Sequence, residues 1–165
     1  MPVVLIGGGS RSGKSRFALE RARQQGSRLG FIATAQAFDT EMEQRIAKHQ
    51  HERGGEFITI EAPFDIPAAL AAHTALDAIV VDCLTLWVSN LMLAGREMPT
   101  ESLIEAARQF PALIIFVTNE VGCGIVPENE LARRFRDEAG RVNQAVAAAA
   151  DEVYWMTFGI SLRMK

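Results

Sequence analysis

The sequence predicts an α/β fold in which a mainly parallel sheet is covered by helices on both faces. Apolar runs of β-type residues alternate with helical patterns along the chain, which is typical of parallel strands joined by helices. Several of these runs are apolar at every position, as strands buried on both faces require. A glycine-rich turn, GGSRSGKS, directly follows the first apolar run, VVLI, and has the pattern of a phosphate-binding loop.

Local patterns place the individual strands and helices. Strands are expected at residues 3–6, 29–33, 57–60, 79–82, 113–118 and 153–156. Helices are expected at residues 14–24, 40–53, 66–76, 85–93, 101–110 and 130–149. The first helix is amphipathic, Asp39 can cap the second, and Gly54 and Gly55 can end it. The alanine-rich end of the last helix favours helical structure and close packing.

Composition limits the classes of protein that the chain can form. Its 165 residues predict one nucleotide-binding domain over 1–165, and a 48% hydrophobic content is enough for a core. There is no apolar run long enough to span a bilayer and no signal-peptide pattern, so we expect a cytoplasmic protein. Cys83 and Cys123 are expected as reduced thiols. The net charge of −3 and the lack of a basic tract argue against nucleic acid as a partner.

The loop from Gly8 to Ser15 is the strongest functional motif in the sequence. Its glycines let backbone N–H groups point at phosphate oxygens, and the following helix directs its positive end at the same place. Lys14 supplies a positive charge for the outer phosphates, and Ser15 offers a hydroxyl to Mg²⁺. Asp82 ends an apolar strand and is expected to help order the same ion, although a strand-end cap is the alternative. The nucleotide-binding residues predicted in the loop are Gly8, Gly9, Ser10, Arg11, Ser12, Gly13, Lys14 and Ser15.

One histidine of the second helix shares a face with apolar residues. Met42, Ile46, His49 and Arg53 recur at spacings of four, three and four, and the apolar pair indicates that this face is buried. His51 lies about 200° further around the helix and points elsewhere. An imidazole is a competent nucleophile toward phosphorus. From this pattern alone His49 can be a nucleophile, a general base or a half-buried structural residue.

Nearly the whole chain resembles one known family. The segments GGSRSGKS, IATAQAFDTEMEQRIAKHQHERG, TIEAP, VDCLTLWVSNLM and VTNEVGCGIVPENELARRFRDEAGRVNQAVAAAADEVYW occur in the order typical of that family. Together they resemble the bifunctional adenosylcobinamide kinase / adenosylcobinamide-phosphate guanylyltransferase family of cobalamin biosynthesis. The resemblance implies a RecA-like P-loop NTPase fold, and residues 159–165 resemble the closing strand of that family.

The resemblance implies two reactions and a role for His49. A nucleoside triphosphate, ATP or GTP, first phosphorylates the hydroxyl of the aminopropanol arm of adenosylcobinamide. GTP then gives GMP to that phosphate, which yields adenosylcobinamide-GDP and releases pyrophosphate. The family's transfer passes through a GMP–histidine intermediate, and its pattern E-M-x-x-R-I-x-x-H places the nucleophile at His49.

Further site residues follow from the resemblance. Residues expected to line or hold the nucleotide are Ala33, Thr34, Ala35, Gln50, His51, Glu52, Arg53, Glu61 and Asp82. A carboxylate can accept hydrogen bonds from both N1 and N2 of guanine, so Glu61 is a plausible reader of the base. Its alternative is a solvated carboxylate at a strand end.

The region after the fifth strand combines glycines with arginines. Pro127 ends a glycine-containing loop, and Arg133, Arg134 and Arg136 follow on the last helix. The resemblance suggests substrate or subunit contacts here, and a solvated basic helix face is the alternative. The resemblance also implies a homotrimer, with adenosylcobinamide, its phosphate and ATP or GTP as binding partners and Mg²⁺ as the metal at Ser15 and Asp82.

Two other functions remain open from the residues alone. The first is a P-loop kinase for a small metabolite in which His49 is structural. The second is a nucleotide-switched binding module related to recombinase-type ATPases, against which the low positive charge argues.

Overall fold

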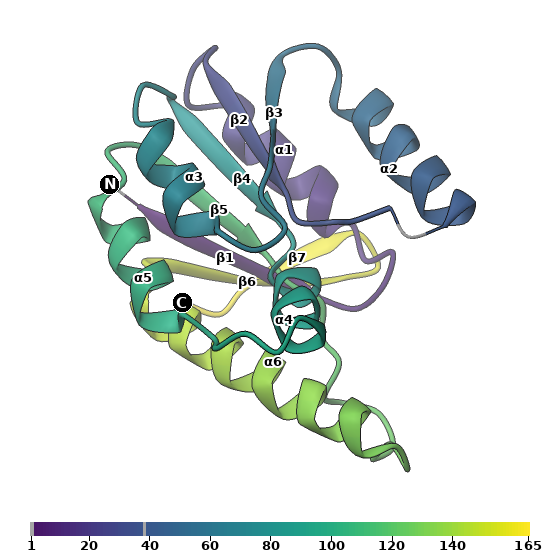
Figure 1. Cartoon of the computed structure of the whole chain (residues 1–165). Coiled ribbons are helices and arrows are strands. Elements are labelled where there is room, and N and C mark those ends of the chain that lie inside the picture. The colour runs from purple at the N-terminus through teal and green to yellow at the C-terminus, as the bar shows by residue number, and fades with distance from the viewer. Residues whose placement is uncertain (1, 38) are drawn as a thin grey trace.

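The computed structural model describes residues 2–37 and 39–165, except for the side chains of Arg45, His49 and Glu52. In this part of the chain seven strands form one sheet in the order β3-β2-β4-β5-β1-β6-β7 (Figure 1). Neighbouring strands are parallel except β6 and β7, which are antiparallel, so the predicted mainly parallel sheet is confirmed. The strands are β1 (Val3–Gly8), β2 (Leu29–Ala33), β3 (Phe57–Glu61), β4 (Ala78–Asp82), β5 (Leu113–Val117), β6 (Glu152–Thr157) and β7 (Ile160–Arg163).

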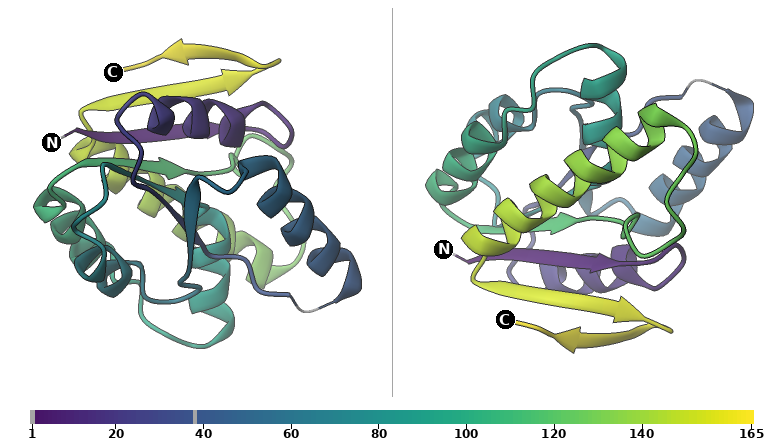
Figure 2. Two further views of the ribbon diagram at one scale, coloured as in Figure 1. Left: turned by 90° about the horizontal axis from the view of Figure 1, so that it is seen from above. Right: turned by 90° about the horizontal axis from the view of Figure 1, so that it is seen from below.

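The helices cover the two faces of the sheet unequally. They are α1 (Lys14–Arg23), α2 (Thr40–Arg53), α3 (Ile66–Ala72), α4 (Leu84–Leu93), α5 (Thr100–Gln109) and α6 (Glu130–Ala149). Helix α1 packs on one face, and α3, α4, α5 and α6 pack on the other, as the two views of Figure 2 show. Among the described residues we find no helix that combines the length and the apolar character needed to cross a bilayer.

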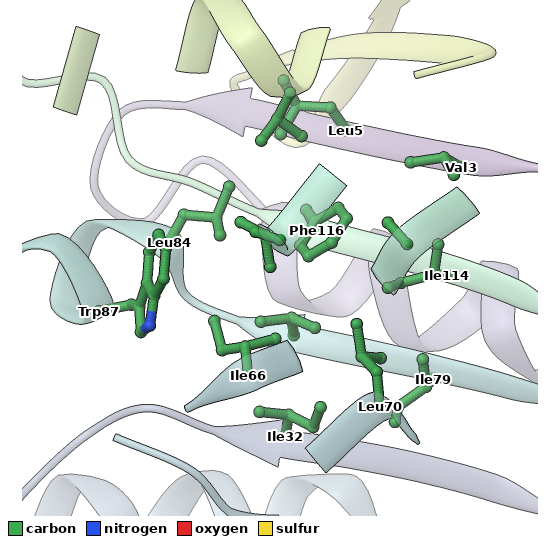
Figure 3. Close-up of a cluster of buried hydrophobic side chains, with 14 of the residues drawn as sticks. Val3, Leu5, Ile32, Ile66, Leu70, Ile79, Leu84, Trp87, Ile114 and Phe116 are labelled. Atoms are coloured by element: carbon green, nitrogen blue, oxygen red, sulfur yellow. The ribbon is translucent and has the colours of Figure 1, made fainter. Parts of the chain in front are cut away.

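The core has two layers because strand side chains alternate between the faces of the sheet. In β1, Val3 and Leu5 face the layer under four helices, while Val4 and Ile6 face α1. Figure 3 shows the larger layer, where Trp87 of α4 lies in the same cluster as Ile66 and Phe116. Burial on both faces explains why the strands β1, β2, β4 and β5 lack the alternating polar positions of a half-exposed strand.

Most element boundaries agree with the sequence prediction within one or two residues, and α3 is the exception. It ends at Ala72 rather than at residue 76, because His73 leaves the helical conformation with φ −124° and ψ 37°. Its ring nitrogen Nδ1 lies 2.8 Å from the carbonyl oxygen of Ala69. The chain then turns, and the backbone N–H of Leu76 donates to the carbonyl of His73 at 3.3 Å, which brings Leu76 into the core.

The expected buried face of α2 is only partly correct. Figure 1 shows α2 at the edge of the sheet beyond β3, whereas the other helices lie over the strands. Met42 and Ile46 are half-buried, and neither belongs to the two core layers. Arg53, in the last turn, is the one buried residue among the described side chains of this helix. The periodicity predicted the face correctly, but a helix beside an edge strand has less sheet to cover it.

A buried amide joins α4 to the loops beside it. The Nδ2 group of Asn90 donates to the carbonyl oxygens of Thr34 at 2.8 Å and Pro63 at 2.9 Å. Asn90→Ala should lower the free energy of unfolding by about 2 kcal/mol, because buried carbonyls lose their donor. A loss of this size corresponds to about 4–8 °C in Tm, measurable by circular dichroism. Gln109→Ala, which removes an exposed amide, should change the stability by less than about 0.5 kcal/mol. Equal shifts in both variants would contradict this role.

Candidate functional site

The phosphate-binding loop joins β1 to α1 and depends on two glycines. Gly8 has φ 149°, and a Cβ atom there would lie 2.4 Å from the carbonyl oxygen of Met156. Gly13 caps α1 with φ 98°, and a Cβ atom there would lie 3.3 Å from the Cα atom of Gly159. At Gly8 a side chain is excluded by the backbone conformation and by β6, and at Gly13 it is disfavoured by the positive φ and by the close approach of Gly159. Backbone conformation and tertiary contacts thus account for Gly8 and Gly13.

Lys14 lies inside the loop that it follows. Its Nζ atom donates to the carbonyl oxygen of Gly9 at 2.5 Å and lies 3.4 Å from the Oγ atom of Ser12. Burial lowers the pKa of the Lys14 ammonium, and the negative charge of Asp82 opposes that effect. A buried ammonium beside one loop carbonyl and one hydroxyl is well placed to exchange these contacts for phosphate oxygens.

The two residues predicted to hold Mg²⁺ are brought together from distant parts of the chain. The Oγ atom of Ser15 donates to Oδ2 of Asp82 at 2.7 Å. A hydroxyl and a carboxylate are oxygen donors of the type that Mg²⁺ prefers when phosphates and waters supply its other ligands. The described residues contain no cluster of three or more His, Cys, Asp or Glu side chains that could form an all-protein metal cage. The pair therefore fits an ion held jointly with a nucleotide.

Three strands end in one row beside this pair. Ala33 of β2 is paired with Asp82 of β4 on one side and with Glu61 of β3 on the other. Residues in register on neighbouring strands point to the same face, which here is the face that α1 covers. Glu61 and Asp82 are two strands apart, about 10 Å between backbones. The two predicted acidic residues thus lie on one side of the sheet at its carboxyl end, where open α/β sheets bind ligands.

Thr34 joins the ends of β2 and β4. Its hydroxyl donates to the carbonyl of Cys83 and accepts from the backbone N–H of Cys83, both at 2.8 Å. Thr34 is fully buried, whereas the neighbouring Ala35 is half-buried. The hydroxyl of Thr34 is therefore engaged in holding the two strand ends, and this contact supports the position of Asp82.

The two cysteines are free, and they lie in opposite environments. Burial, together with the charge of Asp82, raises the pKa of the Cys83 thiol to about 12. A thiol with this pKa stays protonated at neutral pH and is a poor nucleophile. Cys123 is exposed on the loop between β5 and α6. No disulfide is formed between them, in agreement with the sequence prediction.

The residues predicted on α2 have different surroundings. Gln50 and His51 are exposed, and Arg53 is buried against the sheet. The side chains of His49 and Glu52 lie outside the described part of the structure. The backbone of His49 belongs to α2 and lies one helical turn before Arg53.

A polar network at the end of β5 was not predicted from the sequence. The Oγ1 atom of Thr118 donates to Oδ1 of Asn143 at 2.7 Å and lies 3.3 Å from Oγ1 of Thr85. Thr85 accepts from the backbone N–H of Asn119 at 2.7 Å. The next N–H, of Glu120, donates to the carbonyl of Gly8 at 3.0 Å, so the network continues to the phosphate-binding loop. The sequence signal that could have indicated this network is the polar pair Thr118 and Asn119, directly after the all-apolar strand β5.

The arginines of α6 mainly hold the preceding loop. Arg136 donates to the carbonyls of Gly122 and Gly124, and Arg133 donates to those of Pro127 at 3.0 Å and Glu128 at 2.5 Å. Arg134 is exposed. Arg133 and Arg136 therefore do more than form a solvated basic helix face, because they hold the loop that follows β5.

Strand order, loop and acidic strand end together define a class of protein. A P-loop motif after β1 and an acidic residue at the end of β4, on a mainly parallel sheet with helices on both faces, have the arrangement of the P-loop NTPase fold. The flagellar accessory protein FlaH from Methanocaldococcus jannaschii has a similar structure, with a TM-score of 0.59 and 15% sequence identity over 99% of this chain and 78% of that one. This likeness concerns the fold.

Sequence comparison identifies the family within this class. Residues 4–164 match the family described as cobinamide kinase / cobinamide phosphate guanyltransferase, and the chain belongs to this family. It is 42% identical to the bifunctional adenosylcobalamin biosynthesis protein CobP of Pseudomonas aeruginosa, over 98% of this chain and 96% of the relative. It is also 42% identical to the bifunctional adenosylcobalamin biosynthesis protein CobU of Salmonella typhimurium, over 99% of each chain.

The predicted family, fold and activities are confirmed by these comparisons. The chain is a cobinamide kinase and cobinamide phosphate guanylyltransferase of adenosylcobalamin biosynthesis. Its substrates are accordingly cobinamide compounds and nucleoside triphosphates. The nucleotide-switched binding module considered from the sequence is not supported.

Proposed function

We propose that both reactions use the site around Lys14 and Asp82. In the second reaction, His49 takes GMP from GTP and passes it to adenosylcobinamide phosphate. The observation that supports this proposal is that the phosphate loop and the Ser15–Asp82 pair lie at the carboxyl end of the sheet, and that the guanidinium of Arg53, from α2, lies over β2 and β3 on the same face. Arg53 lies close enough to Asp82 for the carboxylate to influence its pKa. His49 precedes Arg53 by four residues, about 6 Å along the helix axis. Because α2 runs antiparallel to the parallel strands that it connects, the backbone of His49 lies one helical turn nearer the carboxyl end of the sheet than that of Arg53.

In the kinase step the loop from Gly8 to Ser15 holds the phosphates of ATP or GTP. Backbone N–H groups, the N-terminus of α1 and the Lys14 ammonium stabilise negative charge on the transferred group. The hydroxyl of the aminopropanol arm of adenosylcobinamide attacks the γ-phosphorus, and the nucleoside diphosphate leaves. Mg²⁺, held by oxygens of Ser15 and Asp82, would neutralise charge between the phosphates.

In the transfer step the imidazole of His49 attacks the α-phosphorus of GTP, and pyrophosphate leaves. The phosphate of adenosylcobinamide phosphate then attacks the phosphorus of the His49–GMP bond, which releases the imidazole and forms adenosylcobinamide-GDP. Glu61 accepts from N1 and N2 of guanine, and Gln50, His51 and Glu52 lie on the same stretch of α2 as the nucleophile. Adenine does not offer this pair of donors, so Glu61 accounts for selection of guanine.

The proposal includes assembly into a homotrimer in the cytoplasm. Exposed apolar side chains gather around the antiparallel end of the sheet, where Phe158 is 94%, Ile160 68%, Leu162 60% and Met164 66% exposed. Apolar surface of this kind is typical of subunit contacts. Native mass spectrometry should show three chains, and a monomer at micromolar concentration would contradict this part of the proposal.

Product analysis tests the two reactions directly. Incubation of adenosylcobinamide with ATP and Mg²⁺ should give adenosylcobinamide phosphate, and addition of GTP should convert it to adenosylcobinamide-GDP, both measured by mass spectrometry. GTP labelled at the α-phosphate should leave an acid-labile label on the denatured protein, and γ-labelled GTP should not. Formation of adenosylcobinamide-GDP without any protein-bound label would overturn the covalent intermediate.

A further inference from the structure

Asn119 lies two residues beyond the end of β5, the strand between β4 and β1 in the sheet (Figure 1). The residues on either side of it continue the pairing with β1. The backbone N–H of Thr118 donates to the carbonyl of Ile6, and the N–H of Glu120 donates to the carbonyl of Gly8, both at 3.0 Å. Residues 118–120 therefore run alongside the start of the phosphate-binding loop.

The backbone of Asn119 is also fixed on the side of β4. Its N–H donates at 2.7 Å to the Oγ1 atom of Thr85, in the first turn of α4. Val117 is in register with Asp82 and belongs to the core layer under α1, so in an extended chain the side chain of Asn119 points to that same side. The distance of 4.0 Å from its Nδ2 atom to Sγ of Cys83, in the same layer, agrees with this orientation. The amide thus lies between the end of β4 and the phosphate-binding loop.

The amide of Asn119 is less well satisfied than the buried amide of Asn90. The Nδ2 group of Asn90 donates to two carbonyl oxygens, at 2.8 Å and 2.9 Å. The hydrogen bond found for Nδ2 of Asn119 within the described part of the chain is a long contact with a thiol sulfur, which is a weak acceptor. Asn119 is also half-buried rather than enclosed. Its amide N–H groups are therefore available to a stronger acceptor, such as a phosphate oxygen.

We propose that Asn119 is a further catalytic residue of the kinase step, whose Nδ2 group donates a hydrogen bond to the γ-phosphoryl group during its transfer. This inference rests on the proposed function, in which the loop from Gly8 to Ser15 holds the phosphates for both reactions. In the kinase step the γ-phosphorus forms a bond to the oxygen of the substrate hydroxyl, and its bond to the β–γ bridging oxygen breaks. The electron pair of that bond leaves with the nucleoside diphosphate, and the hydroxyl proton passes to water. The amide keeps its own protons and stabilises charge on the oxygens of the group in transfer.

The same hydrogen bond should matter little for guanylyl transfer. In that reaction the bond between the α-phosphorus and the α–β bridging oxygen breaks, and the γ-phosphoryl group stays joined to the β-phosphate in pyrophosphate. A hydrogen bond to γ-phosphate oxygens is then about equally strong in the ground state and in the transition state, so it does not lower the barrier. Asn119 therefore distinguishes two reactions that share one phosphate-binding loop.

Asn119→Ala is the main test. With ATP and adenosylcobinamide, the kcat of the kinase step should fall about 10²-fold, which is typical of the loss of one preorganised donor. With GTP and adenosylcobinamide phosphate, the kcat of guanylyl transfer should change by less than about 3-fold. Asn119→Leu keeps the branched shape without the donor, so it should give the same split between the reactions even if alanine disturbs the fold. Gln109→Ala, which removes an exposed amide from α5, is the matched control and should leave both rates unchanged.

Equal loss of both reactions in Asn119→Ala and Asn119→Leu would show a structural role and overturn the proposal. An unchanged kinase rate would overturn it as well. A rise in the KM for ATP with unchanged kcat would also do so, because it would show binding of the ground state alone.

Changes at Thr85 test the placement of Asn119. Thr85→Val removes the acceptor of the Asn119 N–H and should lower the kinase rate in the same direction, whereas Thr85→Ser keeps a hydroxyl and should retain it. Equal effects of Thr85→Val and Thr85→Ser would contradict the placement on which the proposal depends.

A comparison with Lys14→Ala separates this inference from the function on which it rests. If Lys14→Ala kept its kinase activity, the loop would not serve that reaction, and the proposed function itself would be wrong. If Lys14→Ala lost the kinase activity and Asn119→Ala kept it, the proposed function would stand and the role of Asn119 alone would be wrong.

Discussion

Lys14→Ala should abolish both the kinase and the guanylyl transfer. The ammonium is buried in the phosphate loop, where few water molecules compete with it, and no other described lysine lies in that loop. Removing one preorganised charge of this kind costs about 10²-fold to 10³-fold in rate. We expect at least that loss in kcat/KM for each reaction, measured from the phosphorylated and guanylylated products. The fold should survive, because the change removes a buried charge whose pKa burial lowers.

Lys165→Ala provides the control for Lys14→Ala. Lys165 donates to carbonyl groups at the end of α6, outside the loop from Gly8 to Ser15, so both activities should be retained. The result that would contradict a shared phosphate site is the loss of only one of the two reactions. If Lys14→Ala abolished one reaction and spared the other, the two reactions would need separate phosphate sites, and the single site proposed here would be wrong.

His49→Ala should abolish guanylyl transfer and leave the kinase step nearly intact. The imidazole is the proposed attacking group, and loss of a covalent nucleophile typically lowers kcat by at least about 10³-fold. The kinase step should stay within about 3-fold, because the substrate hydroxyl attacks the γ-phosphorus directly. Protein-bound label from α-labelled GTP should disappear at the same time.

His73→Ala is the matched control for His49→Ala. His73 follows α3, and Nδ1 of its ring lies 2.8 Å from the carbonyl oxygen of Ala69, away from the phosphate loop, so the label and both rates should persist. Retention of the label in His49→Ala would assign the intermediate to another residue. A parallel loss of both reactions would instead indicate a structural or general-base role for His49.

Much of the fold was accessible from local patterns. The bounds of β2, α2 and α6 agree with the sequence prediction, because each element has a strong internal signal and a clear end. For α2 the Asp39 side chain accepts from the N–H of Met42 at 2.8 Å, as a capping residue should. The end of α3 was not predicted correctly, because the chain turns at His73 and places Leu76 in the core. This turn depends on tertiary packing and not on a local pattern.

The site was predictable only in part. The loop from Gly8 to Ser15 is a contiguous motif, so its residues could be named directly, and Asp82 followed from its place at a strand end. The network of Thr85, Thr118 and Asn143 was not found, because its members are separated by 33 and 25 positions and form no local pattern. Arg53 was placed on the correct face of α2, but its burial against Phe31 and Thr59 was not foreseen.

The amino-acid sequence by itself determined the succession of strands and helices along the chain, the phosphate-binding loop and the family. Such features depend on residues within a few positions of one another, and hydrophobic period and glycine placement express them directly. Only the tertiary structure decided that Ser15 meets Asp82, that Glu61 and Asp82 flank Ala33, and that Arg53 ties α2 to two strands. The physical reason is that parallel strands pair across long crossover connections, so their register and the side chains that meet at their ends are set by packing of the whole sheet.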